Sequence, residues 1–155
     1  MNIKFRPAGG QCVEYTEGNC ADHLLMRVEE MILIQAEGYA KSGDTGKAKQ
    51  ILESFVKTYR DPAYSVETTG RKFEDEIWFQ RRVELWGEGF SNNDTRRLGK
   101  PLVRFHEGKK TNVPDNFCIN LTPTDGWWLM RFTTSELNTN LAVVDNSEGT
   151  SPVMY

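Results

Sequence analysis

The side chains with the greatest potential for chemistry are two glutamates, Glu84 and Glu88, which lie one helical turn apart. Glycosidases use a pair of carboxyl groups, one of which must hold a proton near neutral pH. Three arginines stand near this pair in the sequence, namely Arg81, Arg82 and Arg97. An ion pair lowers the pKa of a carboxyl group and therefore disfavours the protonated acid. We predict that the charges form a structural ion-pair network that fixes how helices dock, made of Arg81, Arg82, Glu84, Glu88 and Asp94.

Other residues with catalytic or metal-binding potential are few. The two histidines, His23 and His106, have no cysteine, or serine and acid, at the spacing of a catalytic centre. His23 follows Asp22 in a predicted first helical turn, where a capping or surface role is the simpler interpretation. Residues 92–95 offer oxygen ligands but lack the glycine and terminal glutamate of a calcium loop. We therefore predict no catalytic residue, no metal site, no cofactor and no enzymatic activity.

Aromatic residues indicate a different chemistry, because sugar rings present flat C–H faces that stack on tryptophan and tyrosine. Trp127 and Trp128 directly follow a polar turn at residues 123–126 and are the candidate ligand-binding residues. In a strand their side chains would point to opposite faces, so at most one could meet a ligand while the other packs. Filling of the core is the alternative role for both. Trp78 and Trp86, eight residues apart on a predicted helix, are expected to pack.

Composition places the chain with ordinary soluble proteins. Hydrophobic residues make up 38%, charged residues 26%, and the formal net charge is -3. These values exclude the disordered and membrane classes, and a pI near 5.5 argues against a nucleic-acid partner. The chain contains no apolar run of the roughly 18 residues that a membrane span needs. By itself, the chain is expected to be soluble.

The three cysteines do not form a recognisable motif. Cys12, Cys20 and Cys118 contain no Cys-x-x-Cys pair, so they predict neither a zinc site nor a disulfide framework. Cys12 and Cys20 can pair only if the fold brings them to disulfide geometry, which the sequence leaves open.

Helical periodicity begins after an irregular leader at residues 1–21. Apolar residues recur at spacings of three and four from Leu25 to Tyr39, which places them on one face of a helix. Asp22 is the predicted start of this helix, because its carboxylate can accept a hydrogen bond from the first turn. The face is broad enough to require cover on more than one side.

A short turn joins this helix to a second one. Gly43 suits the left-handed conformation at a helix end, and Asp44 can cap the helix that follows over residues 45–59. Two helices joined so tightly predict an antiparallel hairpin over residues 22–60, similar to a tetratricopeptide pair. Such pairs usually stack on about two further copies, and this one appears once. We therefore expect part of its apolar surface to be uncovered, namely Met31, Leu33 and Ile34.

The rest of the chain predicts one more helix and little regular structure. A charged helix is expected within residues 71–99, running roughly over residues 72–88. Residues 100–155 are expected to be irregular, with at most a small β-hairpin, because apolar residues alternate from Phe117 to Leu121. The predicted fold is a mainly α single domain over residues 1–155.

Two segments resemble the SusD/RagB family of outer-membrane glycan-binding lipoproteins. In that family, a helix written approximately Arg-x-x-Glu-Met/Val-Tyr-Leu-Ile-x-Ala-Glu-Ala leads into Gly-Asp and an alanine-containing partner helix. The matching positions agree closely in type and spacing. They are Arg27, Glu30, Met31, Ile32, Leu33, Ile34, Ala36, Glu37, Gly38, Gly43, Asp44 and Ala48.

The second segment resembles the family's Ile-x-x-Glu-Arg-Arg-x-Glu-Leu-x-x-Glu-Gly, followed by Asp-Leu-x-Arg. Gln80 and Thr95 depart from this pattern, which has glutamate and leucine at those positions, and residues 91–93 replace an arginine and two aromatic residues. A weaker similarity covers residues 132–141, without the family's two prolines. The matching positions of the main motif are Ile77, Arg81, Arg82, Glu84, Leu85, Glu88, Gly89, Asp94 and Arg97.

The resemblance implies that the chain is the C-terminal portion of a longer lipoprotein, without its signal peptide, lipid-anchoring cysteine and earlier helical repeats. It also implies a function, as part of a non-catalytic cell-surface receptor that binds oligosaccharide or another nutrient. Its implied partner is a TonB-dependent, SusC-like transporter in the outer membrane, where the full-length protein would face outward. No binding residue is carried over by the motifs.

Two other functions stay open at this stage. A tetratricopeptide-type adaptor would hold a peptide in a concave, polar-rimmed groove on the helix hairpin. A glycosidase ranks third, because it needs two acids roughly 5 to 9.5 Å apart in an open cleft.

Overall fold

The structure is a computed structural model that describes residue 4, residues 25–110 and residues 112–146. The chain divides into two compact units, Met1–Phe90 and Ser91–Tyr155. The predicted leader at residues 1–21 lies outside the described residues, apart from Lys4, as do Cys12, Cys20, Asp22 and His23. The interpretation of residues 1–155 as a single domain stays a prediction.

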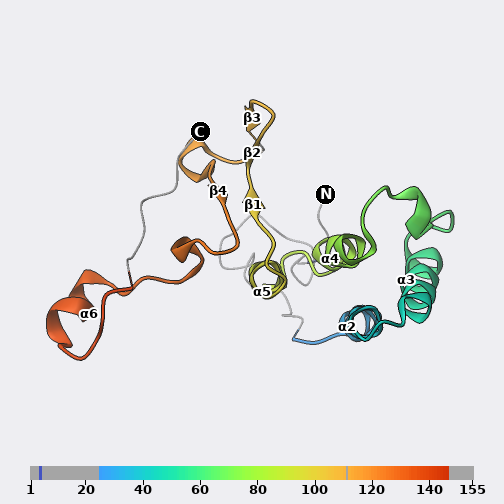
Figure 1. Cartoon of the computed structure of the whole chain (residues 1–155), viewed down its shortest axis with the longest axis horizontal. Helices are drawn as coiled ribbons and strands as arrows, with labels where there is room; N and C mark the ends of the chain where they lie inside the picture. Colours follow the sequence, from blue (N-terminus) through green and yellow to red (C-terminus); the bar gives the residue numbers. More distant parts are fainter. Residues whose placement is uncertain (1–3, 5–24, 111, 147–155) are drawn as a thin grey trace, which may run out of the picture. The chain divides into compact units, whose positions relative to one another are not determined.

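The first unit is built on an antiparallel helix hairpin, as predicted. Helix α2 spans Val28–Lys41 and helix α3 spans Thr45–Tyr59 (Figure 1). Between them, Gly43 adopts a φ of 91°, and the Asp44 carboxylate accepts a hydrogen bond of 3.0 Å from the Lys47 amide. The glycine ends one helix and the aspartate caps the next, which is the turn chemistry that the sequence indicates.

The start of α2 corrects the predicted boundary. The helix begins at Val28, not near Asp22, and Arg27 precedes it in an extended conformation with φ of -145° and ψ of 161°. Leu25 and Met26, expected to lie within the helix, are non-helical and strongly exposed. Because these two side chains bury little apolar surface, packing gives little support to a helix that would begin before Val28.

A third helix, α4, completes the core of the first unit. It spans Phe73–Glu84 and contacts α2, and Figure 1 shows α2, α3 and α4 together in one part of the chain. The 3-10 turn η2, Val66–Thr68, lies on the connection from α3. The buried apolar cluster draws on all these segments and contains Leu33, Ala36, Leu52, Phe55, Val56, Tyr64, Val66 and Ile77.

Helix α4 is shorter than the sequence predicts. It ends at Glu84 with Leu85 as its C-cap, and the next helix, α5, spans only Phe90–Arg97. Gly87 and Gly89, which separate the two helices, have φ of 79° and 85°. These left-handed conformations break the helical path, so the predicted helix over residues 72–88 divides before Gly87.

A buried carboxylate lies beside Gln80, one of the departures from the family motif. Glu76 is completely buried on α4, where its oxygens accept hydrogen bonds from the Tyr64 hydroxyl at 2.8 Å and from Gln80 Nε2 at 2.8 Å. Arg71 Nη1 donates a third, of 3.0 Å. A glutamate in place of Gln80 would set a second negative charge beside this site, whereas the amide supplies a donor. Burial, followed by the bond to Glu76, raises the pKa of the Tyr64 phenol.

The second unit contains short strands and turns. Strand β1 (Leu102–Val103) pairs antiparallel with β4 (Asn120–Leu121), and β2 (Phe105–His106) pairs with β3 (Lys109–Lys110). Glu107 and Gly108 join β2 to β3 with φ of 51° and 73°, so this pair is a small hairpin, and it lies before residues 117–121, where the alternation indicated a strand. The β1–β4 pair exceeds the prediction of at most one hairpin. The remaining elements are η3 (Asp115–Phe117), η4 (Gly126–Trp128) and α6 (Thr134–Thr139).

One side chain organises these strands. Asn120 Oδ1 accepts hydrogen bonds from the backbone amides of Arg104 and Phe105 at 2.8 and 2.9 Å, and its Nδ2 donates to the Phe105 carbonyl at 2.8 Å. Phe117, predicted to lie in the strand, belongs to η3 and is exposed, whereas Leu121 is buried. Of the residues from Phe117 to Leu121, where a strand was expected, only Asn120 and Leu121 belong to one, namely β4.

The fold is mainly α, as predicted, but its exposed apolar residues differ in detail. Met31 and Ile34 are 42% and 46% exposed, as expected for an uncovered helix face, whereas Leu33 is fully buried against the hairpin partner. Trp86, expected to pack, is 57% exposed because it follows the end of α4. None of the helices in the described ranges is long and apolar enough to cross a bilayer.

Replacement of Gly43 by alanine is expected to lower the free energy of unfolding by about 1 kcal/mol, because a Cβ strains a left-handed residue. Gly38, inside α2, is the matched control: no atom lies within 4 Å of an added Cβ there. Its replacement by alanine should raise stability by about 0.5 to 1 kcal/mol. Urea denaturation followed by circular dichroism measures both changes. A stabilising Gly43→Ala substitution would contradict the structure of the turn.

Candidate functional site

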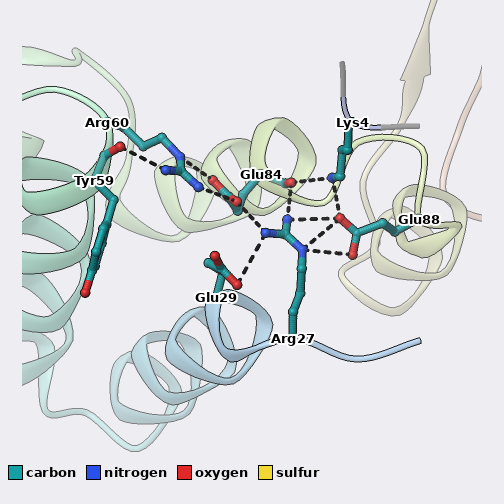
Figure 2. Close-up of polar contacts among 7 residues, drawn as sticks. All are labelled: Lys4, Arg27, Glu29, Tyr59, Arg60, Glu84 and Glu88. Carbon is teal, nitrogen blue, oxygen red and sulfur yellow. Dashed lines mark hydrogen bonds and ion pairs between the residues drawn. The ribbon is translucent and has the colours of Figure 1, made fainter. Parts of the chain in front are cut away.

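The predicted ion-pair network centres on a residue outside the predicted set, Arg27. This residue precedes α2, and its guanidinium lies against the end of α4 (Figure 2). Its Nε donates to both carboxylate oxygens of Glu88, at 3.0 and 3.2 Å, and its Nη1 donates to Glu84 Oε1 at 2.8 Å. Its Nη2 donates to the backbone carbonyl of Glu84. One planar side chain therefore closes the end of α4 with all three of its nitrogens.

Two more cations complete the network. Arg60, just after α3, donates from Nε and Nη2 to the two carboxylate oxygens of Glu84, at 2.8 and 2.7 Å. Lys4 pairs with the Glu88 carboxylate and donates to the Glu84 carbonyl at 2.8 Å. Figure 2 shows both glutamates between cations from segments that lie far apart in the sequence. The network thus ties the start of α2 and the end of α3 to the end of α4.

Burial and charge together set the protonation of this site. The side chains of Glu88, Glu84 and Arg27 are only 2%, 9% and 16% exposed. Hydrogen bonds from Arg60 and then Arg27 outweigh burial and lower the pKa of Glu84. For Glu88, burial is the largest influence and acts to raise the pKa, but the bonds from Arg27 and Lys4 together outweigh it and lower the pKa. Both carboxylates are therefore ionised at neutral pH, and neither suits the role of a protonated general acid.

The other members of the predicted network lie elsewhere. Arg81 is buried on α4, with its Nε 4.0 Å from a Glu37 oxygen of α2. Arg82 is exposed, and its guanidinium lies 4.8 Å from the centre of the Trp78 ring. Among the described residues, no hydrogen bond or ion pair joins Arg82 to Glu84 or Glu88. Arg82 is therefore not part of the ion-pair network around Glu84 and Glu88.

Asp94 makes a local pair in the second unit. It is buried on α5, where Oδ1 accepts a hydrogen bond of 2.8 Å from Arg97 Nε. The pair spans three residues of one helix, so it stabilises α5 itself.

The sequence reasoning missed Arg27, Arg60 and Lys4 as partners of the glutamates. One signal was available for Arg27, because it is the first residue of the motif that resembles the SusD/RagB family. Its bonds to Glu84 and Glu88 span 57 and 61 residues, and no local spacing rule reaches so far.

The two candidate ligand-binding tryptophans lie on a 3-10 turn and not on a strand. Trp128 ends η4, and its Nε1 donates a hydrogen bond of 2.7 Å to the Thr122 carbonyl. Asp125 Oδ2 accepts from the Thr122 amide and hydroxyl at 2.8 and 2.9 Å, which closes the preceding turn. Trp127 is 37% exposed, and the Arg131 guanidinium lies 4.2 Å from the centre of its ring. Because the two residues are not in a strand, the alternation of strand faces does not decide which of them can meet a ligand.

Trp128 lines a hollow of about 610 Å³ within the second unit. One wall comes from α5 and the other from the loop that carries η4. Its lining mixes an aromatic ring with charged and polar groups from Asn93, Arg96, Arg97, Thr124, Asp125 and Trp128. An open hollow in which an aromatic ring and the apolar Pro123 and Leu129 lie beside polar groups can hold a ring-shaped ligand that carries hydroxyl groups.

In the described part of the chain, no three His, Cys, Asp or Glu side chains gather into a group that could hold a metal ion. His106 is exposed on β2, and Cys118 is buried as a free thiol.

Replacement of Arg27 by methionine is expected to lower the free energy of unfolding by about 3 to 5 kcal/mol, because it leaves two largely buried carboxylates short of a partner. Lys57→Met is the matched control, since Lys57 forms an exposed pair with Glu53 one helical turn away. That loss should be only about 0.3 to 0.5 kcal/mol. Chemical denaturation measures both, and equal losses would contradict the central role of Arg27.

The lowered pKa values of Glu84 and Glu88 give a pH dependence with a defined sign. The stability that they contribute is present above the ordinary glutamate pKa of about 4.3 and is lost as pH falls through their lowered values. The wild-type chain should therefore lose stability in acid more steeply than Arg27→Met. Unfolding curves across acid pH check this, and parallel profiles would contradict it.

Comparisons with known proteins agree with the resemblance drawn from the motifs. A model of the SusD family matches residues 4–148. A candidate sugar-binding protein from Bacteroides vulgatus is similar, with 25% identity and a TM-score of 0.66 over 84% of this chain and 30% of that one. A SusD-like carbohydrate-binding protein from the same organism shows 29% identity and a TM-score of 0.56, over 81% and 30%. No curated protein matches.

The chain thus spans about 30% of the length of either solved structure. The family match covers nearly all of the sequence, including both motifs around Arg27 and Glu84. The chain therefore belongs to the SusD family.

Proposed function

We propose that this chain is part of a non-catalytic cell-surface receptor that binds oligosaccharide or another nutrient. The observation that carries the proposal is the family match over residues 4–148. It is supported by the likeness to two Bacteroides vulgatus proteins that are named for sugar or carbohydrate binding. Because the chain spans only part of those structures, the proposal concerns the receptor to which it contributes.

The charges of the first unit favour binding over catalysis. Arg27, Arg60 and Lys4 occupy the oxygens of Glu84 and Glu88, so the most suggestive acid pair serves packing. The hollow beside Trp128, in contrast, combines a ring for stacking with side-chain amide and hydroxyl groups for hydrogen bonds. We infer that this chain contributes to capture through Trp128, and that Trp127, engaged by Arg131, has a supporting role.

The proposed receptor delivers its cargo to a TonB-dependent outer-membrane transporter. A lipid anchor elsewhere in the full-length protein would hold the receptor at the outer membrane, facing outward. Direct transfer requires only that the receptor release its ligand at the transporter, which suits non-covalent binding by stacking and hydrogen bonds.

A hollow on the helix hairpin favours a second candidate function, that of a peptide-binding adaptor. Its volume is about 460 Å³, and its lining residues come from α3 except for Ile32, which comes from α2. Apolar and polar side chains alternate in its lining, which comprises Ile32, Lys47, Gln50, Ile51, Ser54, Phe55, Thr58 and Tyr59. A groove of this kind is the feature that a tetratricopeptide-type adaptor requires. Binding of peptides and of no oligosaccharide would favour this function.

Replacement of Trp128 by alanine is expected to weaken oligosaccharide binding by about tenfold or more, equivalent to about 1.4 kcal/mol. The loss follows from removal of the stacking surface. An oligosaccharide array identifies ligands of the wild-type chain, and isothermal titration calorimetry measures the affinities. Trp86→Ala, which removes an exposed tryptophan from the first unit, is the control and should bind as the wild type does. Binding of no sugar by the wild-type chain, or release of hydrolysis products, would contradict the proposal.

The transporter partnership has an independent test. We expect the gene for this protein to lie beside one for a TonB-dependent transporter, and the two full-length proteins to be cross-linked in intact cells. The lipid-anchored protein is the appropriate sample, because anchoring raises the effective concentration of the partners. An isolated gene and no cross-link would contradict the delivery step and leave binding untouched.

A further inference from the structure

We propose that the hollow beside Trp128 binds an acidic sugar, with Arg96 pairing to the carboxylate or sulfate ester that the sugar carries. The inference rests on the proposed function, since it names the class of oligosaccharide that the receptor takes. It is drawn from the charged groups that line one wall of the hollow, and from how each is already engaged.

Arg96 is the side chain in this hollow with the greatest unused capacity for hydrogen bonding. It is exposed in the last turn of α5 and lines the cavity. Within residues 25–110 and 112–146, and at Lys4, no hydrogen bond or ion pair engages its guanidinium. A guanidinium offers five N–H donors in a planar fork, which matches the paired oxygens of a carboxylate or sulfate. Ligand oxygens can therefore bind there without displacing a protein partner.

The other charged residues of the hollow are held by the protein. Arg97 Nε donates to Asp94, so part of its fork serves α5 itself. The Asp125 carboxylate accepts two hydrogen bonds from Thr122, which keep it in the turn before η4. Asp94 and Asp125 balance the two arginines in formal charge, but both carboxylates already accept hydrogen bonds from the protein, whereas the Arg96 guanidinium is left for a ligand. An anionic ligand is therefore favoured over a neutral one at this wall.

The remaining lining suits the ring of a sugar. The Trp128 indole is held by its bond to the Thr122 carbonyl, so its orientation is set before a ligand arrives. Asn93 lies on α5 three residues before Arg96, and Thr124 lies on the opposite loop. Their amide and hydroxyl groups can bond sugar hydroxyls while the acidic group meets Arg96. The hollow thus offers an aromatic surface, polar groups and one guanidinium.

The test compares ligands that differ in charge and little else. Oligogalacturonate, its methyl ester, and neutral and sulfated galactose oligosaccharides are titrated into the wild-type chain by calorimetry. We expect the free acid to bind about tenfold or more tightly than the ester, a difference that shrinks as salt rises. If the preference for the sulfated over the neutral oligosaccharide exceeds the preference for the free acid over its methyl ester, the acidic group that Arg96 recognises is a sulfate ester and not a carboxylate.

Substitutions at Arg96 test whether this residue causes the preference for charged ligands. Arg96→Gln should remove the preference for the charged ligand and leave affinity for the methyl ester within about twofold. Arg96→Lys should retain only part of the preference, because an ammonium group cannot form the paired bonds. Arg82→Gln, which removes an exposed arginine from the first unit, is the control and should keep the full preference. Circular dichroism confirms that each variant is folded.

The outcomes separate this inference from the proposed function. Equal affinity of the wild-type chain for charged and neutral ligands, or a preference that survives Arg96→Gln, would overturn the inference while sugar binding stands. Binding of none of the oligosaccharides would overturn both.

Discussion

The three-way contact of the Arg27 guanidinium with Glu84, Glu88 and the Glu84 carbonyl is the interaction on which the first unit depends. Ionised side chains that leave water need partners of opposite charge, and the cost of losing one partner exceeds the net value of the pair. Once Arg27 binds there, the start of α2 must lie beside the end of α4. The apolar faces of α2, α3 and α4 then meet in one core, so the charged contact sets the docking that the hydrophobic contacts stabilise.

This arrangement also decides what the glutamate pair can do. A glutamate pair on a helix suggests acid–base chemistry, but here cations occupy the carboxylate oxygens and lower the pKa of both groups. The same residue types therefore lose catalytic potential through their partners. In the second unit, Trp128 and Arg96 line an open hollow in which polar groups have room for a ligand. The charges of Arg27, Glu84 and Glu88 in the first unit are largely buried and hold helices together, whereas Arg96 in the second unit is exposed to solvent.

Much of the fold follows from local rules. The spacing of apolar residues identified α2 and α3, and the Gly43–Asp44 turn was predicted because its chemistry lies in adjacent residues. The predictions of helix boundaries were wrong at the start of α2 and at the end of α4. Helix α2 begins at Val28 and not near Asp22, because Leu25 and Met26 are strongly exposed and give a longer helix little packing. The end of α4 moved to Glu84, because two glycines adopt left-handed conformations that helical periodicity does not register.

The sequence alone determined the helix types, the turn between α2 and α3, and the motifs that identify the family, because each depends on residues within a few turns of one another. Only the tertiary structure decided the partners of Glu84 and Glu88, which come from positions 24 to 84 residues away, from Arg60 with Glu84 to Lys4 with Glu88. It also decided that Trp128 lines a hollow together with residues of α5. The physical reason is the same in each case: helices form through short-range hydrogen bonds, whereas ion pairs and cavities arise where distant segments meet.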